Sequence, residues 1–282
     1  MDNGTTEWVT VSDSMAIIAS ETGECWVLDL DDYGETLPFA RPMTGRGTRG
    51  STAALLNGAV ALGFRGDDAY LRDRAPSLPK YVFHLVAAYH NARRTPGHYR
   101  QAATRFRELD RPDIASYLET HAREETGHDG LVLKDLRALG LPADRIVATL
   151  VPEGVQPLCE FFDRLSSADY PIGVIGYSYC FESTAAMKTK ADVDAMQALC
   201  PEGVGASRFV RAHSQLGSEV RHVEDMIDFV AGLPASDRIE IVKTTYNAAV
   251  MAANLCRAVP KSDSDIWAEI QAAAGEEVHL PA

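Results

Sequence analysis

The residues best suited to binding a metal ion lie at positions 121–129, where the chain reads His-Ala-Arg-Glu-Glu-Thr-Gly-His-Asp. On a continuous helix of about 3.6 residues per turn, His121, Glu125 and His128 stand at i, i+4 and i+7 and share one face. Glu124, four residues before His128, is an alternative to Glu125 by geometry alone. Carboxylate oxygens and imidazole nitrogens suit Fe(II) and Mn(II), so the spacing predicts part of a metal site.

Two further segments offer the same donor types. Glu182 ends the sequence Gly-Tyr-Ser-Tyr-Cys-Phe-Glu in an apolar stretch, where a buried carboxylate needs a metal, an arginine or a tyrosine as a partner. Glu219 and His222 repeat the Glu-x-x-His spacing of Glu125 and His128. A Glu-x-x-His pair on each of two helices, with a further Glu, is the arrangement of di-iron carboxylate bundles.

His213 precedes His222 by nine residues, which turns it by about half a circle on a regular helix. It can join the same centre only if the helix is bulged or kinked over residues 216–218, where a glycine stands. On a straight helix it is instead a surface or core histidine.

The elements that must position these residues are mostly helical. Residues 7–30 form three short β-branched and aromatic runs separated by turn residues, which predicts a three-stranded meander. Residues 33–50 are expected to form a loop, followed by a helix over 52–62 capped by Ser51. From about residue 76 the apolar periodicity is helical throughout. The predicted helices cover residues 79–94, 97–109, 112–139, 155–167, 172–187, 190–199, 206–230, 235–258 and 264–273.

Together, these segments resemble the haem-oxygenase-like dimetal oxidases and oxygenases over about residues 76–258. The resemblance implies a mainly α fold with a haem-oxygenase-like seven-helix bundle over 76–282. The strands and short helix that come before it predict a small α+β module over 1–73. The resemblance implies that the metal ligands are Glu125, His128, Glu182, His213, Glu219 and His222. In several members a first-helix carboxylate is also a ligand. Here His121 stands near that position, and His121, Glu124 and Tyr179 are candidate substitute ligands or supporting residues.

The resemblance also implies an activity. The cofactor would be iron, as two Fe(II) ions, with Mn(II) as the alternative. The enzyme would use O2 to oxidise a small metabolite of specialised metabolism, and we favour an amine or an amino-acid-like substrate that undergoes N-oxygenation or oxidative C–C cleavage. One alternative is a metal-free enzyme of the same fold, thiaminase-like or of the cofactor-maturation type, with Glu182 and His128 as acid and base. The other is an accessory protein whose N-terminal module, which resembles a winged-helix leader-peptide recognition element, binds a peptide.

The overall charge narrows the choice of partners. The formal net charge of −13 disfavours nucleic acid and anionic membrane surfaces. The first residues lack the basic and apolar regions of a signal peptide, so we expect a cytoplasmic protein. A homodimer is a further expectation. The five cysteines include no CxxC pair, which argues against a zinc knuckle or a disulfide framework.

Overall fold

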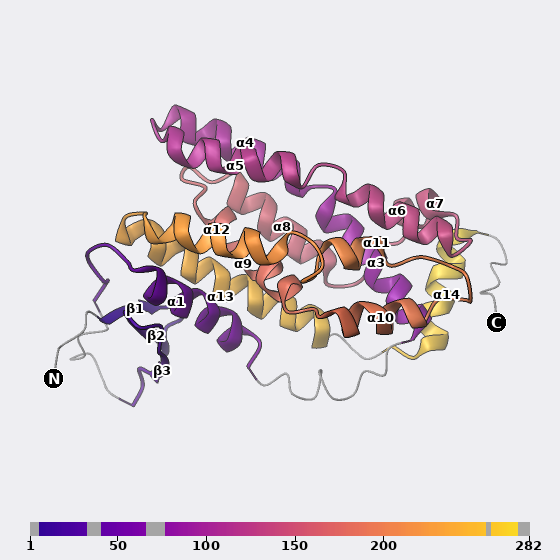
Figure 1. The fold of residues 1–282 in the computed structure, drawn as a ribbon, viewed down its shortest axis with the longest axis horizontal. Coiled ribbons are helices and arrows are strands. Elements are labelled where there is room, and N and C mark those ends of the chain that lie inside the picture. Colours follow the sequence, from indigo (N-terminus) through magenta and orange to yellow (C-terminus); the bar gives the residue numbers. More distant parts are fainter. Residues whose placement is uncertain (1–5, 33–40, 66–76, 258–260, 276–282) are drawn as a thin grey trace. The chain divides into compact units, whose positions relative to one another are not determined.

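The fold was analysed in a computed structural model that describes residues 6–32, 41–65, 77–257 and 261–275, apart from the side chains of Glu219 and residues 255–257. Within these ranges the protein is mostly helical (Figure 1). The contacts divide the chain into two compact units. The first comprises Met1–Asp68, Ile172–Thr184 and Glu219–Ala253, and the second comprises Ala69–Pro171, Ala185–Ser218 and Asn254–Ala282.

The predicted meander is confirmed in the first unit. Strands β1 (Thr6–Thr10), β2 (Met15–Ser20) and β3 (Cys25–Asp29) form an antiparallel sheet in the order β1-β2-β3. The central strand β2 is buried from Ala16 to Ala19, and helix α1 (Arg49–Gly63) packs against the sheet.

Helix α1 begins earlier than predicted because its cap is Thr48 and not Ser51. The Thr48 side chain accepts a hydrogen bond from the Ser51 backbone N–H, and the Ser51 hydroxyl accepts one from the Thr48 N–H. This reciprocal capping box satisfies two backbone donors at the start of the helix. The predicted loop over residues 33–50 is described only from residue 41 onward, and residues 33–40 lie outside the described part.

Three more helices belong to the first unit in whole or in large part, namely α9 (Gly173–Ala186), α12 (Glu219–Ala231) and α13 (Ala235–Arg257). Two polar contacts, one buried and one partly buried, tie the N-terminal elements to them. The guanidinium of Arg238 on α13 pairs with the carboxylate of Glu7 on β1, and the hydroxyl of Tyr179 on α9 donates to the side-chain oxygen of Asn57 on α1 at 2.9 Å. The N-terminal strands therefore pack as part of a larger unit. The boundary expected between residues 73 and 76 falls outside the described residues and stays a prediction.

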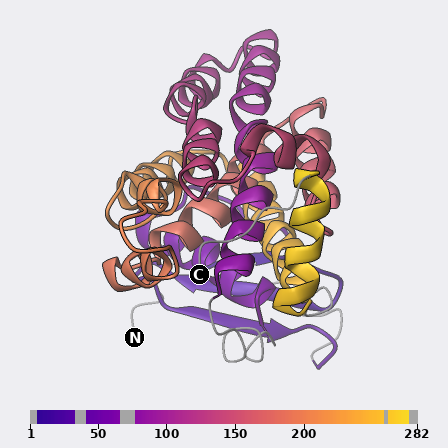
Figure 2. The same ribbon diagram turned by 90° about the vertical axis from the view of Figure 1, so that its right-hand side faces the viewer.

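The second unit contains the remaining helices, which are α3 (Leu78–Ala92), α4 (Thr95–Glu108), α5 (Pro112–Glu124), α6 (His128–Ala138), α7 (Ala143–Thr149), α8 (Val155–Ser166), α10 (Lys190–Ala198), α11 (Arg208–Ala212) and α14 (Asp263–Ala274). Helices α4 and α5 lie side by side in both views (Figures 1 and 2). An apolar core joins α3, α6, α7 and α14 through fully buried residues such as Val82, Leu136, Ile146 and Ile270.

Two predicted long helices are each broken, and both predictions of continuity were wrong. The helix expected over 112–139 ends at Glu124, and α6 begins at His128 after Gly127 adopts φ +95°. The helix expected over 206–230 divides into α11 and α12, with residues 213–218 between them. Helix α7 was not predicted. None of the helices in the described ranges combines the length and apolar character needed to cross a membrane.

Candidate metal centre

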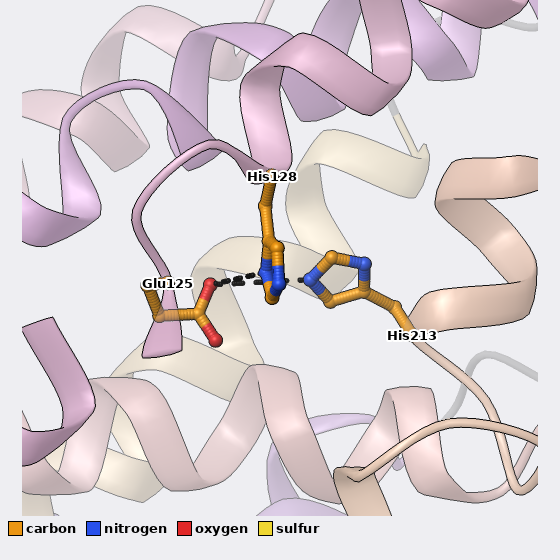
Figure 3. A group of neighbouring side chains, drawn as sticks. All are labelled: Glu125, His128 and His213. Atoms are coloured by element: carbon orange, nitrogen blue, oxygen red, sulfur yellow. Dashed lines mark hydrogen bonds and ion pairs between the residues drawn. The ribbon is translucent and has the colours of Figure 1, made fainter. Parts of the chain in front are cut away.

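The strongest candidate site is a cluster of Glu125, His128 and His213, all in the second unit (Figure 3). One ligand atom from each residue lies within 4.8 Å of the other two. The Nδ1–H of His128 donates to Oε2 of Glu125 at 3.0 Å, and Nε2 of His213 lies 3.9 Å from the same oxygen. The two imidazole rings meet edge to face, with centroids 4.6 Å apart. Two imidazoles and one carboxylate thus converge on a small volume.

The break between α5 and α6 positions the first two members of the cluster. Glu125 is the C-cap residue that directly follows α5, and His128 is the first residue of α6. Gly127 makes the turn in the left-handed region, which costs a residue with a Cβ about 1–2 kcal/mol. The expectation that these two residues lie on one continuous helix was wrong. Glu125 and His128 meet across a turn and do not share a helical face.

The break between α11 and α12 positions the third member. His213 follows α11 with φ −98° and ψ 60°, outside the helical region. Gly217 packs so tightly in the turn that an added Cβ would lie 1.9 Å from the carbonyl oxygen of Ala212. The expectation that His213 joins a centre only if the chain departs from a helix near residues 216–218 agrees with this geometry.

The second ring nitrogen of His213 is also fixed. Its Nδ1–H donates to the carbonyl oxygen of Phe209 at 3.1 Å, and the Phe209 ring packs on the imidazole with centroids 4.3 Å apart. A neutral histidine that donates from Nδ1 carries its lone pair on Nε2, which is the atom that faces Glu125. Sequence reasoning missed Phe209, although a carbonyl four residues before a ligand histidine is a natural partner once a helical turn precedes it.

Electrostatics keep the Glu125 carboxylate ionised. Burial raises its pKa, but the hydrogen bond from His128 and the electrostatic attraction of the two imidazoles outweigh burial, and the pKa falls well below the ordinary value. The side chain is only about a tenth exposed. A buried anion flanked by two imidazoles is the electrostatic environment that a divalent cation completes.

The donor set fits a hard or borderline divalent ion. Two ligand atoms that each lie about 2.1 Å from one ion, roughly at right angles, are about 3 Å apart. The distance of 3.0 Å between Glu125 Oε2 and His128 Nδ1 is close to this value. Two histidines and one carboxylate with open positions are typical of non-haem Fe(II) oxygenases, whereas a structural zinc site would use four ligands and often thiolates. The three residues therefore fit a divalent ion such as Fe(II), Mn(II) or a catalytic Zn(II).

The other expected ligands lie in the first unit. Glu182 on α9 and His222 on α12 are both buried, and His222 Nδ1 lies 3.6 Å from Glu182 Oε2. This distance is longer than a hydrogen bond and within the range of an ion pair. Glu219 begins α12, but its side chain lies outside the described part. The assignment of all six residues as ligands stays a prediction.

The three supporting candidates differ in their surroundings. His121 is buried against the rings of Tyr117 and Tyr99, with centroids 4.4 and 5.9 Å away, and is not a member of the cluster. Glu124 is exposed, with Oε2 at 3.9 Å from His121 Nδ1, so burial favours Glu125 as the ligand. Tyr179 is fully buried, its pKa is raised by burial, and its hydroxyl binds Asn57.

Comparison with known proteins identifies the fold. No family model matches the sequence, and no curated protein matches it. A solved domain of unknown function with a haem oxygenase-like fold from Shewanella denitrificans superposes with a TM-score of 0.56 at 19% identity, covering 78% of this chain and 90% of that one. A TenA homologue from Pseudomonas syringae pv. tomato superposes with a TM-score of 0.54 at 12% identity, covering 77% and 98%.

These similarities define the class of fold and not an activity. The protein has a haem oxygenase-like helical fold with a small antiparallel sheet at its N-terminus, as the sequence predicted. Within this fold the described residues form one candidate metal centre of three residues.

Proposed function

We propose that the protein is a non-haem iron-dependent oxidase or oxygenase. The observation that supports the proposal most directly is the convergence of Glu125, His128 and His213 on one small volume. The fold is compatible with such an enzyme and does not require one. Sequence resemblance to dimetal oxidases suggests a second ion, with Glu182, Glu219 and His222 as further ligands, and a small amine or amino-acid-like substrate.

The residues of the cluster have distinct roles in this proposal. A ferrous ion bound by them would supply electrons to O2 and so activate it, and the substrate would be the electron donor that is oxidised. Glu125 offsets positive charge at the centre, because its low pKa keeps it anionic at neutral pH. His213 keeps its Nε2 lone pair available because Nδ1 donates to Phe209. Burial of Glu125 restricts water at the centre.

Oxygen consumption tests the activity. Protein reconstituted anaerobically with Fe(II) is mixed with O2 and a panel of amines and amino acids, and products are identified by mass. We expect substrate-dependent O2 uptake that His128→Ala abolishes and that His84→Ala retains, since His84 lies exposed on α3 outside the cluster. Substrate turnover that persists at full rate after iron is removed with a chelator would contradict the proposal.

A metal-free enzyme is the second candidate, because one structural neighbour is a TenA homologue. In this alternative Glu182 and His128 act as acid and base without iron. The two candidates predict opposite responses to the chelator. Hydrolysis of a substrate without O2, unchanged by metal removal, would favour the metal-free enzyme.

Peptide binding by the N-terminal module is a third candidate. It is suggested by β3, whose Trp26 and Val27 are 49% and 40% exposed in the three-stranded sheet. An edge strand can pair with an extended peptide. The variant Trp26→Ser should bind such a peptide more weakly, with unchanged Fe(II) binding. Equal peptide binding by Trp26→Ser and the unchanged protein would exclude β3 as the peptide-binding surface.

A further inference from the structure

Asp135, in the third turn of α6, is a fully buried carboxylate that is not a member of the metal-site cluster. Its Oδ2 accepts the backbone N–H of Phe209 at 2.9 Å, and its Oδ1 accepts Nη1–H of Arg208 at 3.0 Å. Both donors belong to the first turn of α11. Asp135 therefore binds the start of the short helix that His213 directly follows.

The same residue, Phe209, connects Asp135 to the centre. Its N–H donates to Asp135, while its carbonyl oxygen accepts the Nδ1–H of His213. Helix α6 also begins with His128, seven residues before Asp135. One helix thus carries a cluster histidine directly and holds the other through two successive hydrogen bonds at Phe209.

Other contacts hold the segment that leads into α11. The hydroxyl of Tyr81 donates to the carbonyl oxygen of Ala206 at 2.7 Å. The side-chain amide of Gln197 donates to the carbonyl oxygen of Val204 at 2.6 Å, and its oxygen accepts the Ala206 N–H at 3.3 Å. These bonds restrain the segment before α11. Within α11 itself, Asp135 bonds to Arg208 and Phe209, and Val210 packs in the apolar core.

Stability alone gives a weak reason for a charge at this position. Buried ion pairs can often be replaced by apolar residues with little loss of stability, whereas short helices depend on tertiary contacts for their position. A five-residue helix such as α11 cannot by itself fix the direction of the His213 side chain that follows it.

We propose that Asp135 is a positioning residue that holds α11 in the placement where His213 Nε2 faces Glu125 and His128. The metal-binding consequence rests on the proposed function. The placement of α11 does not, so the two can be tested separately.

The experiment compares Asp135→Ala, Asp135→Asn and the control Ile270→Ala. Asparagine retains an oxygen that can accept the Phe209 N–H. Ile270 is a fully buried residue of the apolar core on α14, a helix that packs mainly against α3 and α7. Hydrogen–deuterium exchange over residues 207–213 reports on α11 without metal. Titration with Co(II), followed by its absorption spectrum, reports on the centre, and thermal melting shows that each variant is folded.

We expect Asp135→Ala to speed exchange over residues 207–213 and to lower Co(II) affinity by about tenfold or more, in line with the loss of a group that orients a ligand. Asp135→Asn should restore most of both properties. Ile270→Ala should lower the melting temperature while leaving the exchange of this segment and the Co(II) spectrum unchanged.

The outcomes separate the two claims. Absence of Co(II) and Fe(II) binding by the unchanged protein would defeat the proposed function, while the exchange data would still decide the role of Asp135. Unchanged exchange in Asp135→Ala, or an equal increase in Ile270→Ala, would overturn the positioning role. Normal Co(II) binding by Asp135→Ala would also overturn it, even if the proposed function holds.

Discussion

At the scale of single residues, the types of the candidate metal-binding residues could be predicted, whereas the geometry that brings them together could not. Glu125, His128 and His213 were all candidates from residue type and spacing, and the structure gathers these three. The choice of Glu125 over Glu124 could not be made from helical spacing, because both are compatible with His128. Burial distinguishes them, since Glu125 is buried and Glu124 is exposed. Burial of this kind depends on where α5 ends, which no residue pattern marked.

Two histidines outside the cluster predict how stability depends on pH. His98 donates or accepts at Nδ1 with the Ser166 hydroxyl and lies 3.1 Å from Asp163 through Nε2. Burial lowers its pKa, only partly offset by the Asp163 carboxylate. Burial also lowers the pKa of His90, whose Nε2–H donates to the Leu150 carbonyl. Both residues are therefore more readily protonated in the unfolded chain.

The unfolded state consequently binds more protons as the pH falls below about 6.5, the ordinary histidine value, and the free energy of unfolding decreases there. The decrease is complete once the pH is below the folded-state pKa. The free energy of unfolding, measured with urea, should fall less between pH 7.5 and pH 5.5 for His98→Gln than for the unchanged protein. Equal losses in the two proteins would mean that His98 does not contribute.

At the scale of elements, the positions of helices could be predicted and two important breaks could not. The expected segments 79–94, 97–109 and 155–167 correspond to α3, α4 and α8 within a few residues. Apolar periodicity continues through the breaks at Gly127 and at residues 213–218, so it indicated two continuous helices. Tertiary packing overrides periodicity at these two places, and both breaks carry cluster residues.

Gly127→Ala tests the first break. A Cβ at φ +95° should destabilise the protein by about 1–2 kcal/mol and should weaken Fe(II) binding by shifting Glu125 relative to His128. The control is Gly130→Ala in α6, where an added Cβ meets no atom within 4 Å and alanine should stabilise the helix by up to about 1 kcal/mol. Chemical unfolding and Fe(II) titration measure both effects. The same response from the two variants would show that the left-handed turn is not what matters.

At the scale of the whole molecule, the helical class and the N-terminal sheet followed from periodicity and β-branched runs, and the fold comparison agrees. The grouping of the N-terminal strands with α9, α12 and α13 did not follow from the sequence. It depends on contacts such as that between Glu7 and Arg238, which are 231 positions apart. Long-range pairs of this kind leave no local pattern.

Glu7→Ala tests this long-range contact. The side chains of Glu7 and Arg238 are about 6% and 1% exposed, so removing the carboxylate leaves a buried guanidinium without its anion. We expect a loss of about 3–5 kcal/mol in the free energy of unfolding. Asp228→Ala removes the partner of Arg49 from an exposed pair in the same unit and should cost no more than about 1 kcal/mol. Comparable losses in urea unfolding would contradict a special role for the buried pair.

The central claim is that Glu125, His128 and His213 bind a divalent metal ion, and anaerobic titration with Fe(II) tests it most directly. The unchanged protein should bind at least one ion per chain through this cluster, and His213→Ala should weaken that binding by more than about tenfold. His84→Ala serves as the histidine control and should bind as the unchanged protein does. An iron content near zero under reducing, iron-replete conditions, or a His213→Ala protein that binds Fe(II) normally, would contradict the claim.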